Sequence, residues 1–162
     1  MHPEFITHCS VQERDLYFLS VGEPRSFPDS ISIPSQKFAV FLALNAAELD
    51  HTIISGIILP LLRAGAVYFC CYGPDCGRVH DIIDEEIVMS TLDQEDDGSV
   101  IMTTWHDDET LEDALWFFVM NSYPDDKYFD ACRAGVAISI GNPSWDDQII
   151  RGLKDLTKAK IP

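Results

Sequence analysis

The stretch FAVFLAL, at residues 38–44, contains seven consecutive apolar residues. A run of this length without a polar side chain is typical of a β-strand that is buried on both faces of a sheet. Three further runs resemble it: AVYFCCY at 66–72, SVIMTTW at 99–105, which alternates more, and VAISI at 136–140. We therefore expect four parallel strands at these positions.

Segments with apolar residues at helical spacing separate these runs. Asn45 followed three residues later by Glu48 resembles a capping box and predicts the start of the first helix, which Gly65 should end. Asp107 and Asp108 are expected to open a third helix, and Asn142 before Pro143 to open the last. Alternating strands and helices predict a Rossmann-like or flavodoxin-like three-layer α/β sandwich, with a mainly parallel sheet of four to five strands.

The 162 residues fit a single domain with an N-terminal extension. Residues 1–36 are expected to form an N-terminal arm, because proline and serine punctuate positions 22–36 and only the short run at 16–21 suggests an edge strand. Residues 37–162 should then form one α/β domain.

Acidic residues dominate the charge of the chain, which has a formal net charge of −16. Residues 75–130 contain 17 acidic and 2 basic residues, a formal charge of −15, so one central stretch carries nearly all of it. Phosphates and anionic lipids repel such a surface, so neither nucleic acid nor a membrane is an expected partner. A basic protein partner is the class that this charge favours.

The cysteines and glycines of the sequence limit its localisation and its cofactors. Five cysteines, two of them adjacent in an apolar run, predict reduced thiols in a cytoplasmic protein, and the N-terminus has no pattern of a signal peptide. Neither G-x-G-x-x-G nor G-x-x-x-x-G-K-[ST] occurs, so we expect no nucleotide cofactor.

Ligands of open parallel sheets bind beyond the carboxyl ends of the strands, which selects the loops 45–51, 73–80, 105–109 and 141–147. Two interpretations of their polar residues stay open. In one, carboxylates bind Mg²⁺ or Zn²⁺ and a histidine acts as a base, as in a metal-dependent hydrolase; its residues are Glu48, His51, His106, Asp107 and Asp108. In the other, which we favour, the acids only cap helices and no metal is bound. A nucleophilic site of Cys76 with His51 or His106 is a weaker alternative.

Aromatic residues near the acidic stretch suggest a surface for a partner. Trp116 and Phe117 lie off the apolar stripe of their helix, so either the segment 128–129 covers them or they form an exposed patch. The candidate binding surface combines acids and one tryptophan: Asp84, Glu85, Asp107, Asp108, Glu112, Trp116, Asp125 and Asp126.

Between residues 38 and 142, about two-thirds of the chain, the sequence resembles an uncharacterised bacterial α/β domain family, a domain of unknown function. The resemblance is carried by YGPDC at 72–76, TWHDDE at 104–109, ALWFF at 114–118 and IGN at 140–142. It implies a bacterial origin but no catalytic residue. We expect a protein-binding module without catalysis of its own, such as an immunity or inhibitor protein, an adaptor, or an accessory component of a conflict or defence system.

Overall fold

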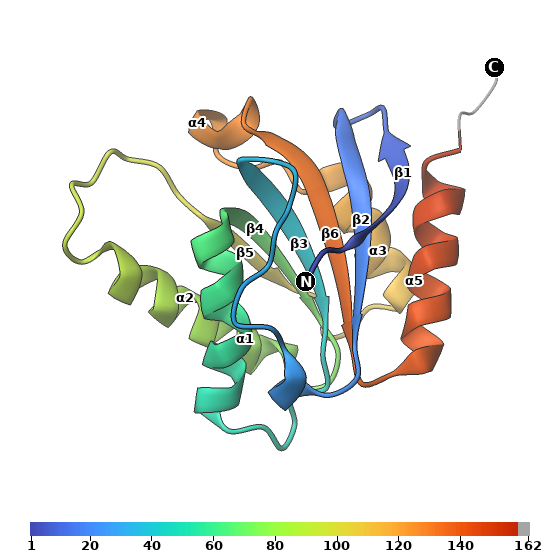
Figure 1. Cartoon of the computed structure of the whole chain (residues 1–162), viewed down its shortest axis with the longest axis horizontal. Helices are drawn as coiled ribbons and strands as arrows, with labels where there is room; N and C mark the ends of the chain where they lie inside the picture. Colours follow the sequence, from blue (N-terminus) through green and yellow to red (C-terminus); the bar gives the residue numbers. More distant parts are fainter. Residues whose placement is uncertain (159–162) are drawn as a thin grey trace.

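The computed structural model describes residues 1–158, which form a six-stranded sheet between two layers of helices (Figure 1). The α/β sandwich is confirmed, with six strands in place of the four or five expected. The strands are β1 (Glu4–Cys9), β2 (Arg14–Val21), β3 (Lys37–Ala43), β4 (Ala66–Tyr72), β5 (Met102–Trp105) and β6 (Cys132–Ile140). Their order across the sheet is β1-β2-β6-β3-β4-β5, and all neighbours are parallel except β1 and β2.

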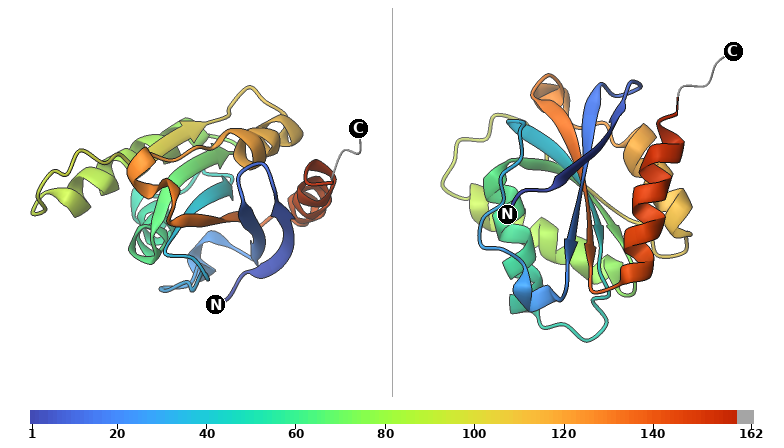
Figure 2. Two further views of the ribbon diagram at one scale, coloured as in Figure 1. Left: turned by 90° about the horizontal axis from the view of Figure 1, so that it is seen from above. Right: turned by 45° about the vertical axis from the view of Figure 1, so that its right-hand side comes forward.

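Helices cover both faces of the sheet, as the views of Figure 2 show. On one face lie α1 (His51–Ala64) and α2 (Cys76–Thr91), and on the other α3 (Leu111–Asn121) and α5 (Pro143–Leu156). A single 3₁₀ turn (Pro24–Ser26) and the one-turn helix α4 (Asp126–Phe129) occupy connections. The chain therefore returns from the edge strand β5, through α3, to place β6 in the middle of the sheet.

The N-terminal residues contribute more to the sheet than an arm with one edge strand. The run at 16–21 lies in β2, an interior strand that pairs with β1 on one side and with β6 on the other. The edge is β1, whose residues Glu4–Cys9 were not expected to form a strand. Five of its six residues are exposed or half-buried, so the sequence there has no long apolar run.

Two of the three predicted helix starts are wrong by several residues. Helix α1 begins at His51, because the Asn45 side chain accepts a hydrogen bond from Ala47 N–H (3.1 Å) and forms a local turn instead of a cap. Helix α3 is capped by Thr110, whose hydroxyl accepts from Asp113 N–H, and not by Asp107 or Asp108. The third prediction is confirmed: Asn142 caps α5 by accepting from the N–H groups of residues 144 and 145.

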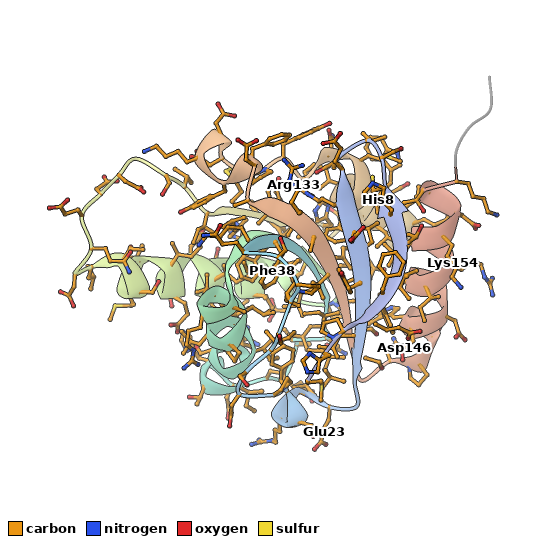
Figure 3. All side chains as sticks on the ribbon, turned by 45° about the horizontal axis from the view of Figure 1, so that its top comes forward. His8, Glu23, Phe38, Arg133, Asp146 and Lys154 are labelled. Carbon is orange, nitrogen blue, oxygen red and sulfur yellow. The ribbon has the colours of Figure 1, made fainter. Side chains whose placement is uncertain are left out.

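Large apolar side chains fill both faces of the central strands. Phe38, labelled in Figure 3, packs on the side of α1 and α2, and Phe41 packs on the side of α3 and α5. Both are fully buried, as is Phe69 of β4. This two-sided burial explains why the runs at 38–44 and 66–72 contain no polar residue.

The guanidinium of Arg14 is buried at the end of α3. It donates hydrogen bonds to the hydroxyl (3.0 Å) and the carbonyl oxygen (2.8 Å) of Ser122, and that hydroxyl donates in turn to the carbonyl of Phe118. Burial lowers the pKa of Arg14. The positive charge therefore faces the negative end of the α3 dipole, which stabilises both the helix terminus and the buried cation.

Gly56, within α1, and Gly65, at its C-terminal end, should respond in opposite ways to substitution by alanine. Gly65 has φ +115°, and a Cβ there would overlap the carbonyl oxygen of Gln36, so Gly65→Ala should lower the free energy of unfolding by about 2 kcal/mol or more. Gly56 is exposed with nothing within 4 Å of an added Cβ, so Gly56→Ala should raise it by about 0.5–1 kcal/mol. Urea unfolding of both variants measures the difference, and equal effects would contradict the αL role of Gly65.

Candidate functional site

The parallel pairing brings the carboxyl ends of five strands, β2, β6, β3, β4 and β5, to one end of the sheet. The four loops predicted from the sequence, 45–51, 73–80, 105–109 and 141–147, all begin there. The loop after β2 is a fifth, and its Gly22 is the residue that follows that strand. The location of the candidate loops is thus as expected, and the question becomes which of their side chains meet.

The residues of the hydrolase hypothesis do not converge. His51 lies on α1 and contacts Glu85 of α2 (3.1 Å), whereas the His106 ring packs against Phe117 of α3, across the sheet. Glu48, Asp107 and Asp108 are exposed. Within residues 1–158, no group of three or more His, Cys, Asp or Glu side chains is arranged to hold a metal ion.

His106 forms the most connected polar cluster at this end of the sheet. Its ring is 5% exposed; Nδ1 lies 2.5 Å from a carboxylate oxygen of Glu109, and Nε2 lies 3.0 Å from the hydroxyl of Thr104. Its backbone N–H donates to the carbonyl of Cys71 at the end of β4 (2.9 Å). One residue therefore ties β5 to β4 and to the turn before α3.

The Thr104 hydroxyl, the His106 imidazole and the Glu109 carboxylate lie in the order found where a nucleophile is activated. The Thr104 hydroxyl lies within hydrogen-bond distance of His106 Nε2 (3.0 Å) and also donates to the carbonyl of Phe69 (3.5 Å). The cluster lines an open hollow of about 360 Å³ along β5, together with Thr103, Trp105 and Phe117. Its three bonds all serve to hold the strand in place, and we assign His106 that positioning role.

The buried cysteines are poor nucleophiles. Burial raises the pKa of Cys70 to about 12 and raises the pKa values of Cys71, Cys76 and Cys132. Cys76 packs in the apolar cluster on the side of α1 and α2, while the His106 ring lies on the opposite face. The nucleophilic pair of Cys76 with His106 is therefore not assembled.

The second half of α2 and the loop after it extend beyond the sheet (Figure 1). We call residues 85–98 the overhang. Helix α2 is anchored through the buried Cys76, Val79, Ile82 and Ile83 and, in its second half, through the half-buried Ile87. From residue 88 to residue 98 every side chain is exposed. Met89 (66% exposed) and Leu92 (64%) place large apolar groups there. Large apolar groups exposed on a projecting helix make the overhang a candidate contact surface.

Carboxylates surround β5 on both sides. Asp84 of α2 accepts a hydrogen bond from the Thr103 hydroxyl (2.8 Å), and Trp105 stacks with His80 of α2 at 4.4 Å between ring centroids. Glu109 lies on the other face, beside His106. Of the predicted binding residues, Asp84, Glu85, Asp107 and Asp108 thus border β5 or the overhang.

The other predicted binding residues lie elsewhere. Trp116 and Glu112 line a groove of about 430 Å³ between α3 and α5, with Arg151 opposite. Trp116 is half exposed, whereas Phe117 turns inward against Tyr68 and His106. Asp125 caps α4 and accepts from Val100 N–H (3.0 Å), and Asp126 is exposed in the first turn of α4.

The sequence analysis did not identify Thr103, Thr104 and Glu109, which form the polar contacts of β5. It also missed Met89 and Leu92 of the overhang. Met89 lies seven residues after the buried Ile82, on the same face of α2, so no sequence pattern signals its exposure, which follows from the helix extending beyond the sheet (Figure 1). The bond between His106 and Glu109 spans a turn of the chain, and no pattern in the sequence distinguishes it from capping.

The model of a domain of unknown function (DUF7684) matches residues 16–156. The chain belongs to this family. The match confirms the resemblance seen in residues 38–142 and extends it to β2 and α5. No curated protein and no solved structure matches the chain. In the part of this DUF7684 chain that the structure describes, no helix has the length and hydrophobicity needed to cross a membrane.

Thiol reactivity should report the burial of the cysteines. Since burial raises the pKa of Cys70 to about 12, and raises those of Cys71, Cys76 and Cys132, few thiolates exist at pH 8 in the folded chain. We expect these four thiols to react with Ellman's reagent at least about 100-fold more slowly than in urea. Raising the pH above 8 should accelerate the reaction of the folded protein by a larger factor than that of the unfolded one, because the unfolded thiols with their ordinary pKa soon become fully ionised. A rapid native thiol would contradict the structure.

Removal of the His106 ring should destabilise the fold. His106→Ala leaves Glu109 and Thr104 without their partner and opens a space beside Phe117, so we expect the free energy of unfolding to fall by about 2–3 kcal/mol. The neighbouring exposed Asp107→Asn is the matched control and should change it by less than about 0.5 kcal/mol. Urea unfolding followed by tryptophan fluorescence measures both free energies of unfolding. Similar values for the two variants would contradict the positioning role of His106.

Proposed function

We propose that this protein is a binding module for a basic protein partner, acting as an inhibitor or adaptor without catalysis of its own. The observation that carries the proposal is the overhang, where exposed Met89 and Leu92 lie in a segment whose charged residues are all acidic. Apolar side chains at the centre and charges around them form the arrangement typical of a protein interface.

The charge of this region has a single sign. Residues 79–126 contain 15 acidic residues and no lysine or arginine. Arg78, just before them, is bound to Asp75 (2.8 Å) and to the backbone carbonyls of Ala46 and Leu49. Hydrogen bonds from Ser99 and, more weakly, the charge of Lys127 lower the pKa of Asp97. A field of this kind attracts a cationic surface over roughly 10 Å at physiological ionic strength and accelerates encounter.

Two basic residues of α5 lie on the side of the molecule opposite the overhang, whereas Lys127 lies beside Gly98 of the overhang. Figure 3 shows Lys154 on α5, projecting away from the sheet, with α2 and the overhang at the other side. Arg151 also belongs to α5. This separation of charge gives the molecule one strongly acidic side, which supports directional docking of a basic partner.

Binding is better supported than metal-dependent hydrolysis. A hydrolase needs its carboxylates and bases at one point, but His51 and His106 lie on opposite faces of the sheet. The hollow beside β5, of about 360 Å³, is open, and Glu109 is the one carboxylate among its lining residues, which are Thr103, Thr104, Trp105, His106, Glu109 and Phe117.

Affinity capture with variant baits tests the proposal. The wild-type protein should retain a basic protein from a lysate of the cells that produce it, and 0.5 M NaCl should release that protein because the attraction is screened. Met89→Lys with Leu92→Lys introduces two positive charges at the apolar centre, so the isolated partner should bind at least about tenfold more weakly in a titration.

Val11→Lys is the control, since Val11 is similarly exposed (59%) but lies in the turn between β1 and β2. It should bind the partner as the wild type does. Capture that does not distinguish the two variants, or a captured protein without a basic surface, would contradict the proposal.

A further inference from the structure

The outer edge of β5 presents unpaired backbone groups. His106 N–H donates to the carbonyl of Cys71, so residues 102, 104 and 106 direct their backbone groups toward β4. Since N–H and C=O of a strand residue point to the same side and alternate along the chain, those of Thr103 and Trp105 point away from the sheet. The edge therefore offers two donors and two acceptors to an incoming strand.

An open hollow lies along this edge, beside the position that an added strand would take. Thr103, Trp105, Phe117 and Glu109 line it, and its volume is about 360 Å³. Met102 and Trp105 are partly exposed (38% and 49%) and supply apolar contact at either end of the strand. Sheet edges in proteins are commonly protected by lysine, proline or a bulge. The strand Met102–Trp105 has none of these, and its brevity is its main protection.

The opposite edge of the sheet differs. In β1, the pairing with β2 is interrupted by an irregularity between Phe5 and Thr7, and α5 packs against the strand. Such irregularity discourages the addition of another strand. Of the two edges of the described sheet, β5 is the one prepared to accept a strand.

Carboxylates flank both faces of this edge. Asp84 lies on the face of α2 and is bonded to Thr103, and Glu109 lies on the face of α3. Asp107 and Asp108 follow the strand directly, and both are exposed. Successive side chains of an added strand point to opposite faces, so lysine or arginine at any position meets a carboxylate. A second copy of this chain would bring like charges together and is disfavoured.

We propose that the basic partner docks by adding an extended lysine- or arginine-rich segment as a seventh strand along β5. This inference rests on the proposed function and specifies the binding mode of the same acidic side. Backbone hydrogen bonds to Thr103 and Trp105 would provide affinity, and the flanking carboxylates would select for basic side chains.

The test uses the full chain and a fluorescent peptide of alternating lysine and valine, eight residues long, at 50 mM NaCl. We expect saturable binding by fluorescence anisotropy and slowed hydrogen exchange of the Thr103 and Trp105 amides by NMR. A peptide of alternating glutamate and valine should not bind. No binding of the basic peptide to the wild type, or exchange slowed elsewhere but not at these two amides, would overturn the inference.

Two changes, one in the protein and one in the peptide, remove backbone hydrogen bonds while keeping the charges. Thr103→Pro deletes an outward N–H, which an edge strand tolerates, and should weaken binding at least about tenfold. Thr103→Val keeps the N–H but loses the hydroxyl bond to Asp84, and should bind within about twofold of the wild type. A basic peptide N-methylated at alternate residues should bind as weakly to the wild type as the unmodified peptide binds to Thr103→Pro.

The outcomes separate this inference from the proposed function. If the proline variant and the N-methylated peptide bind as well as their controls, strand addition is wrong while docking of a basic partner at the overhang still stands. If the wild type forms a dimer through β5, seen as a doubled mass in light scattering that Thr103→Pro abolishes, a second copy is the occupant and the inference is overturned. Exchange at Thr103 and Trp105 in the wild type decides the question even if the proline variant unfolds.

Discussion

The contact of Phe118 with Gly135 is the packing constraint on which the sheet depends. A Cβ at Gly135 would lie 2.9 Å from the Phe118 ring and 2.8 Å from Leu16, so the bare backbone of β6 is what lets both side chains approach. Strand β6 pairs with β2 on one side and β3 on the other. It therefore joins the N-terminal hairpin to the rest of the sheet, and this junction requires α3 to sit close to its centre.

The position of α3 determines what remains open at the edge. Besides its contact with β6, α3 packs closely on α5, where a Cβ at Gly152 would overlap Leu115. The helix is thereby held over the middle of the sheet, and beyond Phe117 it leaves the adjacent face of β5 uncovered. On the opposite face, α2 contacts β5 through Asp84 and His80, and its side chains are exposed from residue 88 onward. The acidic side chains therefore collect beside the edge, where they need not be buried.

Much of the fold could be predicted because burial leaves a local pattern. The runs at 38–44 and 66–72 identified β3 and β4, and Asn142 with Pro143 identified the start of α5. The position of β6 between β2 and β3 could not be read from the sequence, since it depends on pairs of residues 95 to 119 positions apart, such as Leu16 with Gly135. The start of α1 was wrong because the Asn45 side chain bonds locally, an alternative that a capping pattern does not exclude.

The loops around the candidate site could be located from the sequence, but the contacts between their side chains could not. The rule of strand ends located the four loops at one end of the sheet, whereas the partners of His106 are set by tertiary structure: Thr104 shares its side of β5, and Glu109 returns to it through the turn. Counting charges identified the acidic segment. The positions of its residues around β5 depend on the strand order and could not be read from the sequence.

Placing Asp84, Asp107, Asp108 and Glu109 around one edge strand costs stability, because like charges repel within a folded domain. None of the buried contacts of α2, made by Cys76, Val79, Ile82 and Ile83, needs those charges. At the same place, the bonds of His106 to Thr104, Glu109 and Cys71 hold a four-residue strand in a fixed conformation. A strand that is already ordered loses little entropy when a second strand binds to it. A basic segment bound at β5 would relieve the repulsion between the acids, and the ordered edge would lose little entropy on binding it. Both effects favour the binding proposed above, whereas the isolated domain requires neither the acids nor the ordered edge.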